Sequence, residues 1–186
     1  MYYIFETDWS TLPTGEEVLT IIDYPKNTPT PIEFYLGLPL PEPFKSMRYR
    51  YSISLNMRKP YPDNWVSGPF DVLSRKLLKI FALFSVKFEA FSATLIDEIN
   101  QEEIMDEYFV FNILESNNCF DVKKSSAGFK IKRLVLSRDL KNSSVMMSRD
   151  VHHKTLIIVH EDLKFAIESA GVIGCYFTPV EKFKRG

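Results

Sequence analysis

Glycine is scarce in this chain, and neither sign of charge dominates. Only 7 of the 186 residues are glycine. The chain therefore has little of the backbone freedom that phosphate-cradling loops and dinucleotide-binding turns require, and neither motif occurs. The 23 basic and 24 acidic residues nearly cancel, whereas proteins that neutralise many phosphates usually carry a basic excess. We therefore expect no direct binding of nucleic acid.

Cysteine and histidine are also few, and they fit no metal or redox motif. Cys119 and Cys175 stand among apolar neighbours, as small buried thiols of a reducing compartment do. His152, His153 and His160 match no spacing used by zinc proteases, zinc fingers or zinc deaminases. The sequence predicts no metal site and no cofactor.

Long apolar runs are absent as well. No uninterrupted run approaches the roughly 20 residues that a membrane-spanning helix needs. The first residues, Met1 to Asp8, contain no basic side chain and reach an acid at Glu6, unlike the start of a secretory signal peptide. We expect a cytoplasmic protein that does not contact a membrane.

Apolar side chains and prolines, by contrast, are plentiful. Hydrophobic residues make up 45% of the chain, with 15 Phe and 9 Tyr, which is enough for a packed core without disulfides. Nine of the eleven prolines lie between Pro25 and Pro69, and proline favours turns and edge strands. We predict a Pro-rich, β-containing N-terminal subregion over 1–65 and an α+β domain over 66–186, joined in one compact body.

Alternation predicts one clear strand in the first subregion and several in the second. Over 48–56, Tyr49, Tyr51, Ile53 and Leu55 share one face. Over 86–96 the apolar phase slips between Ala90 and Phe91, which predicts a bulge or a bend of the strand there. The segment 108–114 is nearly continuously apolar, as a central strand is. Further strands are expected over 129–136 and 144–147.

Two helices are predicted. The first spans about 12 residues, with Asp71 as its N-cap and an apolar stripe at helical spacing, formed by Leu73, Leu77, Ile80, Phe81 and Phe84. The second follows a buried strand over 155–159, and its apolar stripe consists of Leu163, Ala166, Ile167 and Ala170. Gly171 is placed to end it in the left-handed conformation, before an extended segment over 175–178. The predicted fold is α+β, with a mixed or antiparallel sheet and two main helices.

One charge cluster is a candidate for partner binding. The segment from Asp97 to Glu107 holds six acids, namely Asp97, Glu98, Glu102, Glu103, Asp106 and Glu107. Such a run is typical of a solvated connection between two apolar strands. The alternative is an acidic face that attracts a basic partner protein.

The second half of the chain resembles a known family. The segments 71–78, 86–91 and 108–114, then Asp121 and Ser125, and then the segments 131–136 and 156–180 occur in the order found in immunity protein family eleven of bacterial polymorphic-toxin systems. The resemblance covers about residues 66–180 and implies a non-catalytic protein that binds a cognate toxin or effector domain, often a nuclease, in the cytoplasm of the producing cell. The family tends to have Ser where this chain has His160, and histidine is a poorer N-cap.

Two other functions remain open from the sequence. A small enzyme that reverses a toxin's modification would need a polar site, and His160 beside a carboxylate is its one starting point. A regulatory module that binds peptide or nucleic acid would use Arg48, Arg50 and Trp65. Alternation places Tyr49 and Tyr51 opposite the two arginines, which favours core packing of the aromatic rings.

Overall fold

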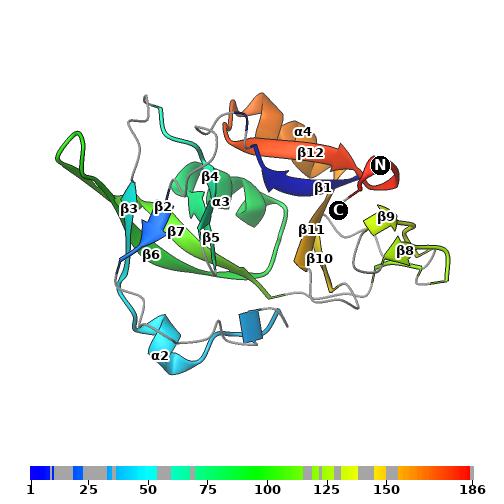
Figure 1. Ribbon diagram of the computed structural model, residues 1–186, viewed down its shortest axis with the longest axis horizontal. Helices are drawn as coiled ribbons and strands as arrows, with labels where there is room; N and C mark the ends of the chain where they lie inside the picture. Colours follow the sequence, from blue (N-terminus) through cyan, green and yellow to red (C-terminus); the bar gives the residue numbers. More distant parts are fainter. Residues whose placement is uncertain are drawn as a thin grey trace.

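The computed structural model of the chain has two main sheets and two long helices that share one apolar core (Figure 1). It describes residues 1–8, 10, 19–22, 33–34, 37–53, 60–67, 70–114, 119–121, 123–127, 131–137, 145–149 and 155–184. Phe81 of the first long helix stacks edge-on against Phe5 of one sheet at 5.9 Å and lies 5.2 Å from Phe111 of the other, measured between ring centres. The helices therefore share one apolar core with both sheets. The α+β prediction is confirmed.

The larger sheet is mixed and has the strand order β2-β3-β6-β7-β5-β4. Its strands are β2 (Leu19–Ile21), β3 (Tyr49–Ile53), β4 (Asn64–Ser67), β5 (Phe70–Ser74), β6 (Phe88–Asp97) and β7 (Glu102–Ile113). Only the β3–β6 pair is parallel. The buried half of β7 lies at the centre, as its apolar sequence predicts. The short helix α2 (Glu42–Lys45) precedes β3.

The smaller sheet joins the two ends of the chain. Its order is β10-β11-β1-β12, all antiparallel, with β10 (Val145–Arg149), β11 (Thr155–His160), β1 (Tyr2–Thr7) and β12 (Cys175–Pro179). A two-stranded ribbon, β8 (Ser126–Ala127) and β9 (Ile131–Arg133), and the turn η2 (Val180–Lys182) lie nearby. Because β1 belongs to this sheet and β3 to the larger one, the range 1–65 contributes strands to both.

The first long helix, α3 (Arg75–Leu83), begins later than its apolar pattern predicts. Asp71 and Leu73 lie on β5, and the N-cap is Ser74, whose Oγ accepts a hydrogen bond from the amide of Leu77 at 3.1 Å. The prediction of Asp71 as the cap is wrong. Leu73 and Leu77 face the same core, so the apolar spacing continues from strand into helix, while pairing with β4 and β7 holds residues 70–74 extended.

The expected bulge between Ala90 and Phe91 is also wrong. Strand β6 pairs with β7 in unbroken register from Phe88 to Ala93. The apolar phase changes because both faces of β6 are covered, with Phe88 in the core beside α3 and Phe91 against the core on the other face. The irregularity lies further along, where the three residues 105–107 of β7 oppose Thr94 alone.

Several local predictions are confirmed. Tyr49, Tyr51 and Ile53 are buried on one face of β3. The second long helix, α4 (Glu161–Ser169), buries Leu163 and Ile167 and is followed by a glycine in the left-handed region, with φ of 63° at position 171. Cys119 is buried, as predicted, whereas Cys175 is only half-buried. Of the predicted strand over 129–136, residues 131–133 form β9 and Leu136 forms an isolated bridge with Phe120. The residues Leu55, Phe129, Lys130, Ser144, His152 and His153 lie outside the described residues.

Three apolar cores follow from this arrangement. One lies on the face of the larger sheet away from α3 and contains Tyr49, Tyr51, Trp65 and Phe70. The second fills the space between the sheets, and the third covers the outer face of the smaller sheet around Ile158. Within the described residues, no helix has both the length and the apolar character needed to cross a membrane.

Candidate functional site

The β6–β7 hairpin, at the left of Figure 1, extends beyond β5, which pairs with β7 only over residues 108–111. On its other side, β3 runs beside β6 as far as Asp97. The hairpin turn is fixed by Asp97, whose carboxylate accepts hydrogen bonds from the amides of Ile99 at 3.0 Å and Asn100 at 2.8 Å, and from Nδ2 of Asn100 at 2.6 Å. The Tyr61 hydroxyl donates a further bond at 2.5 Å. The residue is 0% exposed. Asp97 therefore supports the hairpin from inside, and a partner cannot reach it in this structure.

Electrostatics agree with this structural role. Burial by itself would raise the pKa of Asp97, but the hydrogen bonds from Tyr61, Asn100 and Ile99 outweigh it and lower that pKa to about 2. Burial, together with the bond to this carboxylate, raises the pKa of Tyr61 to about 12. At neutral pH the pair is therefore a phenol donating to an ionised carboxylate, which is a strong hydrogen bond.

The five other acids of the cluster do not form one continuous face. Glu102 lies opposite Asp97, on the side of Tyr61, whereas Glu103 lies opposite Ile96 on the other side. Alternation along a strand sends successive side chains to opposite faces. The others are Glu98, which accepts a hydrogen bond from the Ser52 hydroxyl at 2.9 Å, and the exposed Asp106 and Glu107 of the bulge. Their partner-binding role stays a prediction.

The bulge in β7 is held in place by Arg75 at the start of α3. Both Nε and Nη2 of Arg75 donate to the carbonyl oxygen of Asp106, the former at 2.8 Å, and the guanidinium lies 4.9 Å from the centre of the Phe109 ring. Asp106 has a φ of 61°, which aspartate tolerates better than most residues. This bulge is a built feature of the strand and exposes Met105 and Glu107.

Apolar side chains accompany the acids on the hairpin. Ile99 in the turn is 51% exposed and Met105 in the bulge is 62% exposed. Large apolar side chains beside charged ones are the combination that protein interfaces bury, with the apolar groups at the centre and the charges at the rim. The hairpin can therefore present a preformed contact surface to another protein.

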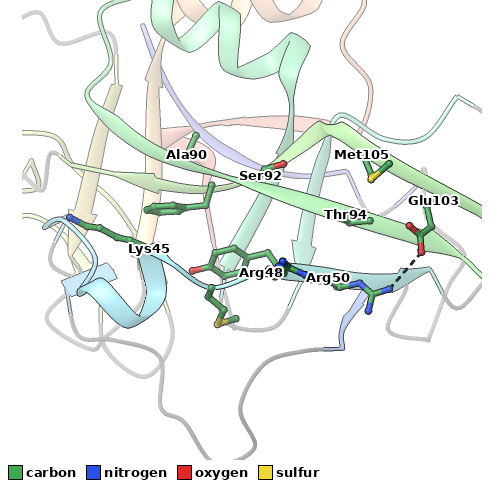
Figure 2. Close-up of a pocket in the computed structure, with 11 residues that line it drawn as sticks. Lys45, Arg48, Arg50, Ala90, Ser92, Thr94, Glu103 and Met105 are labelled. Atoms are coloured by element: carbon green, nitrogen blue, oxygen red, sulfur yellow. Dashed lines mark ion pairs between the residues drawn. The ribbon is translucent and has the colours of Figure 1, made fainter.

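A groove lies beside the hairpin, over β3 and β6 (Figure 2). It encloses about 640 Å³. The cations Lys45, Arg48 and Arg50 line it from α2, the residue before β3 and β3 itself, and Glu103 and Met105 line it from β7, with Arg50 and Glu103 paired at 3.6 Å. Small side chains of β6 also line it, namely Ala90, Ser92 and Thr94. The acidic cluster of the sequence thus contributes one member, Glu103, to a mainly basic groove.

The aromatic residues near this groove do not form a stacking platform. Trp65 is 1% exposed, and Tyr49 and Tyr51 are equally buried in the core. Arg50 points to the opposite face of β3, Arg48 directly precedes that strand, and both side chains line the groove. The prediction that the rings pack in the core is confirmed, and Trp65 is not accessible to a nucleic acid base.

His160 is the N-cap of α4, although histidine is a poorer N-cap than serine. Its Nδ1 accepts a hydrogen bond from the amide of Asp162 at 3.4 Å, as a helix N-cap side chain does. The ring makes an edge contact with Tyr2 at 5.1 Å. These contacts account for the histidine in a place where serine is the usual cap.

A second buried carboxylate, Asp63, was not singled out by the sequence. It is 8% exposed and accepts hydrogen bonds from the Ser74 hydroxyl at 2.5 Å and the amide of Ile173 at 2.9 Å. It thereby ties the start of α3 to the segment after α4. The signal that could have found it is the Pro-Asp-Asn sequence at 62–64, which is typical of a turn with a side-chain bond to backbone.

The Cys175 thiol and the metal-binding side chain types of the described residues do not form a reactive site. Burial next to Asp63 raises the pKa of the Cys175 thiol, which keeps it protonated and a poor nucleophile. Among the residues that the structure places, no three His, Cys, Asp or Glu side chains gather as a metal site would need. No protein family profile matches the chain, and no curated protein matches it significantly. The surface that the geometry points to is therefore the hairpin with its adjoining groove.

Proposed function

We propose that this protein is an immunity protein, which binds and neutralises a cognate toxin in the cytoplasm of the bacterium that produces both. The observation that carries the proposal is the projecting β6–β7 hairpin, with its exposed acids, Ile99 and Met105. The order of segments over about residues 66–180, which resembles immunity protein family eleven, supports the same function.

Preorganisation is the physical reason to regard the hairpin as a binding element. The turn is held by the four hydrogen bonds to Asp97, and the bulge is held by Arg75. A surface that is ordered before association loses little conformational entropy on binding, so more of its contact energy appears as affinity. An inhibitor acts by occupying another protein's surface, and a rigid projection suits that task.

Charge adds a second argument. Glu98, Glu103 and Glu107 are exposed on the hairpin, and acids on a projection raise the rate at which a basic partner is encountered. A toxin that cleaves nucleic acid needs a basic surface to hold its substrate. The hairpin therefore fits the basic surface of a nuclease toxin better than it fits an acidic partner.

Co-expression with the toxin-like domain encoded next to this gene tests the proposal. We expect cells to survive only when this protein is present, and the two proteins to purify as a 1:1 complex. Failure of the wild-type protein to protect the cells, with the toxin domain active, would refute the proposed function.

A matched pair of charge reversals tests the hairpin within that assay. Glu107→Lys lies in the exposed bulge, and Glu181→Lys makes the same charge change in η2, near the carboxyl end of the described chain. We expect Glu107→Lys to slow association severalfold and to flatten its dependence on salt, while Glu181→Lys leaves both unchanged. Equal association rates for the two variants would remove the hairpin from the interface. Association is measured by stopped-flow fluorescence.

A further inference from the structure

The groove beside the hairpin carries more positive charge than the fold requires. Arg48 is exposed, and among the described residues none forms a hydrogen bond or ion pair with it. Arg50 lies 3.6 Å from the carboxylate of Glu103, and Lys45 lies 3.6 Å from that of Glu89. The lining thus contains three cations and one carboxylate, which leaves it attractive to further negative charge.

The spacing of the two arginines matches an extended chain. Arg48 directly precedes β3 and Arg50 lies on it, two residues further along the chain, and both line the same groove (Figure 2). A repeat of two residues along a strand spans about 6.6 Å. Acidic side chains at alternate positions of an extended peptide project toward one face at that same interval. Arginine pairs with carboxylates in a bidentate geometry, which gives such an alignment its specificity.

The shape of the groove also suits a peptide. Three of the β6 side chains that line it are short, with Ala90 and Ser92 exposed, so a bound backbone can approach the sheet closely. Met47 and Met105 stand at its margins, and methionine adapts to irregular apolar groups. The Arg50–Glu103 pair is an example, within this protein, of a carboxylate placed against a cation of the groove.

We propose that this groove binds an extended segment of the toxin that carries acidic side chains at alternate positions, with Arg48 and Arg50 as their partners. The inference rests on the proposed function, since it assigns the segment to the toxin. The contact surface is then bipolar, with an acidic hairpin and a basic groove side by side. A partner that fits it must present a basic patch next to an acidic segment, which a partner of one charge sign cannot do.

Nucleic acid is the competing occupant, and the geometry favours a peptide. Single-stranded nucleic acid binds where basic groups accompany accessible aromatic rings. Two aromatic residues line this groove, and of these Tyr49 is 1% exposed while Phe91 is half-buried against the core. Glu103 lines the groove and would repel a phosphate backbone. An extended peptide brings fewer charges and can place them between the existing ones.

A labelled peptide of four glutamate–threonine repeats is the first probe, and fluorescence anisotropy at low salt is the readout. We expect saturable binding to the wild-type protein, weakened at least tenfold by Arg48→Glu. Lys79→Glu is the matched control, because Lys79 is an exposed cation on α3 that does not line the groove. Ala90→Trp fills the groove without changing its charge and should also abolish binding.

Glu103→Gln gives the sharpest test, since it should tighten peptide binding severalfold by releasing Arg50. Absence of saturable binding, equal effects of Arg48→Glu and Lys79→Glu, or weaker binding after Glu103→Gln would each overturn the inference. Tighter, Arg48-dependent binding of a single-stranded DNA of equal charge would assign the groove to nucleic acid instead. Thermal unfolding of each variant shows that the fold is retained.

The protection assay separates this inference from the function on which it rests. We expect Arg48→Glu and Ala90→Trp to lose protection while Lys79→Glu keeps it. If the groove variants protect as well as the wild-type protein, the toxin does not occupy the groove and the inference fails while the immunity function stands. If the wild-type protein binds the peptide but does not protect the cells, the proposed function fails. The groove then still binds acidic extended peptides, but the segment can no longer be assigned to the toxin.

Discussion

Two carboxylates in the larger sheet meet opposite surroundings. Asp97, at the hairpin turn, receives four hydrogen bonds and has a pKa lowered to about 2. Asp71, the second residue of β5, is held opposite Phe111 and Val66, and burial raises its pKa to about 6. Among the described residues none donates a hydrogen bond to its carboxylate. The difference shows that available donors, rather than burial alone, decide whether a carboxylate stabilises this fold.

The largest effect is expected at Asp97. Asp97→Ala removes the acceptor of four hydrogen bonds and leaves the amides of Ile99 and Asn100 without it, so we expect a loss of about 3 kcal/mol in the free energy of unfolding. Urea denaturation measures it. A loss below about 0.5 kcal/mol, the range of ordinary surface substitutions, would show that the turn does not depend on this residue.

The direction of the pKa shift of Asp97 determines how its stabilisation of the fold depends on pH. The pKa of Asp97 is lower in the folded than in the unfolded state, so its stabilisation is present above pH about 4 and is lost as pH falls toward 2. A shift of nearly two units corresponds to about 2.5 kcal/mol. Urea denaturation at pH 5 and pH 2.5 should show the wild-type protein losing more stability than Asp97→Asn does.

Asp71 should behave in the opposite way. Its pKa is raised in the folded state, so the unfolded chain ionises first and stability falls as pH rises from about 4 to about 6. Asp71→Asn removes the ionisation. We expect the free energy of unfolding to rise by about 1–2 kcal/mol at pH 7 and to change little at pH 4. The rise is smaller than the full pKa shift corresponds to, because the side chain is partly exposed. An equal effect at both pH values would show that ionisation is not the cause.

The smallest effect tests one donor of the hairpin turn. Tyr61→Phe removes the hydroxyl bonded to Asp97 and keeps the ring that packs against the core. We expect the free energy of unfolding at pH 7 to fall by about 1 kcal/mol, as urea denaturation measures. The pKa of Asp97 should rise, which NMR titration of its carboxyl carbon reports. An unchanged pKa in this variant would mean that the backbone amides alone hold the carboxylate ionised.

The sequence predicts the secondary structure of this chain best where a local pattern has a single physical cause. The stripe of α4, the buried face of β3 and the left-handed glycine after α4 each follow from side-chain spacing or backbone sterics at neighbouring residues. Prediction failed at β5 and β6. There Leu73 fits a strand and a helix equally well, and Phe88 and Phe91 belong to different cores on the two faces of one strand.

The candidate site shows the same limit. The six acids are evident as a cluster along the chain, but alternation and the bulge distribute their side chains, and burial removes Asp97 from the surface. The groove could not be predicted, because it joins Arg48 and Arg50 to residues about forty positions later through the parallel pairing of β3 with β6. Parallel pairing between segments far apart leaves no signal in either segment alone.

The sequence by itself determined the α+β class, the strand faces of β3 and the limits of α4, because these depend on propensity and spacing within a few residues. Only the tertiary structure decided which acids are exposed, where the basic groove lies and which carboxylate is stabilised. Those properties depend on donors and neighbours brought together across the sheet, such as Tyr61 at Asp97 and Arg75 at Asp106.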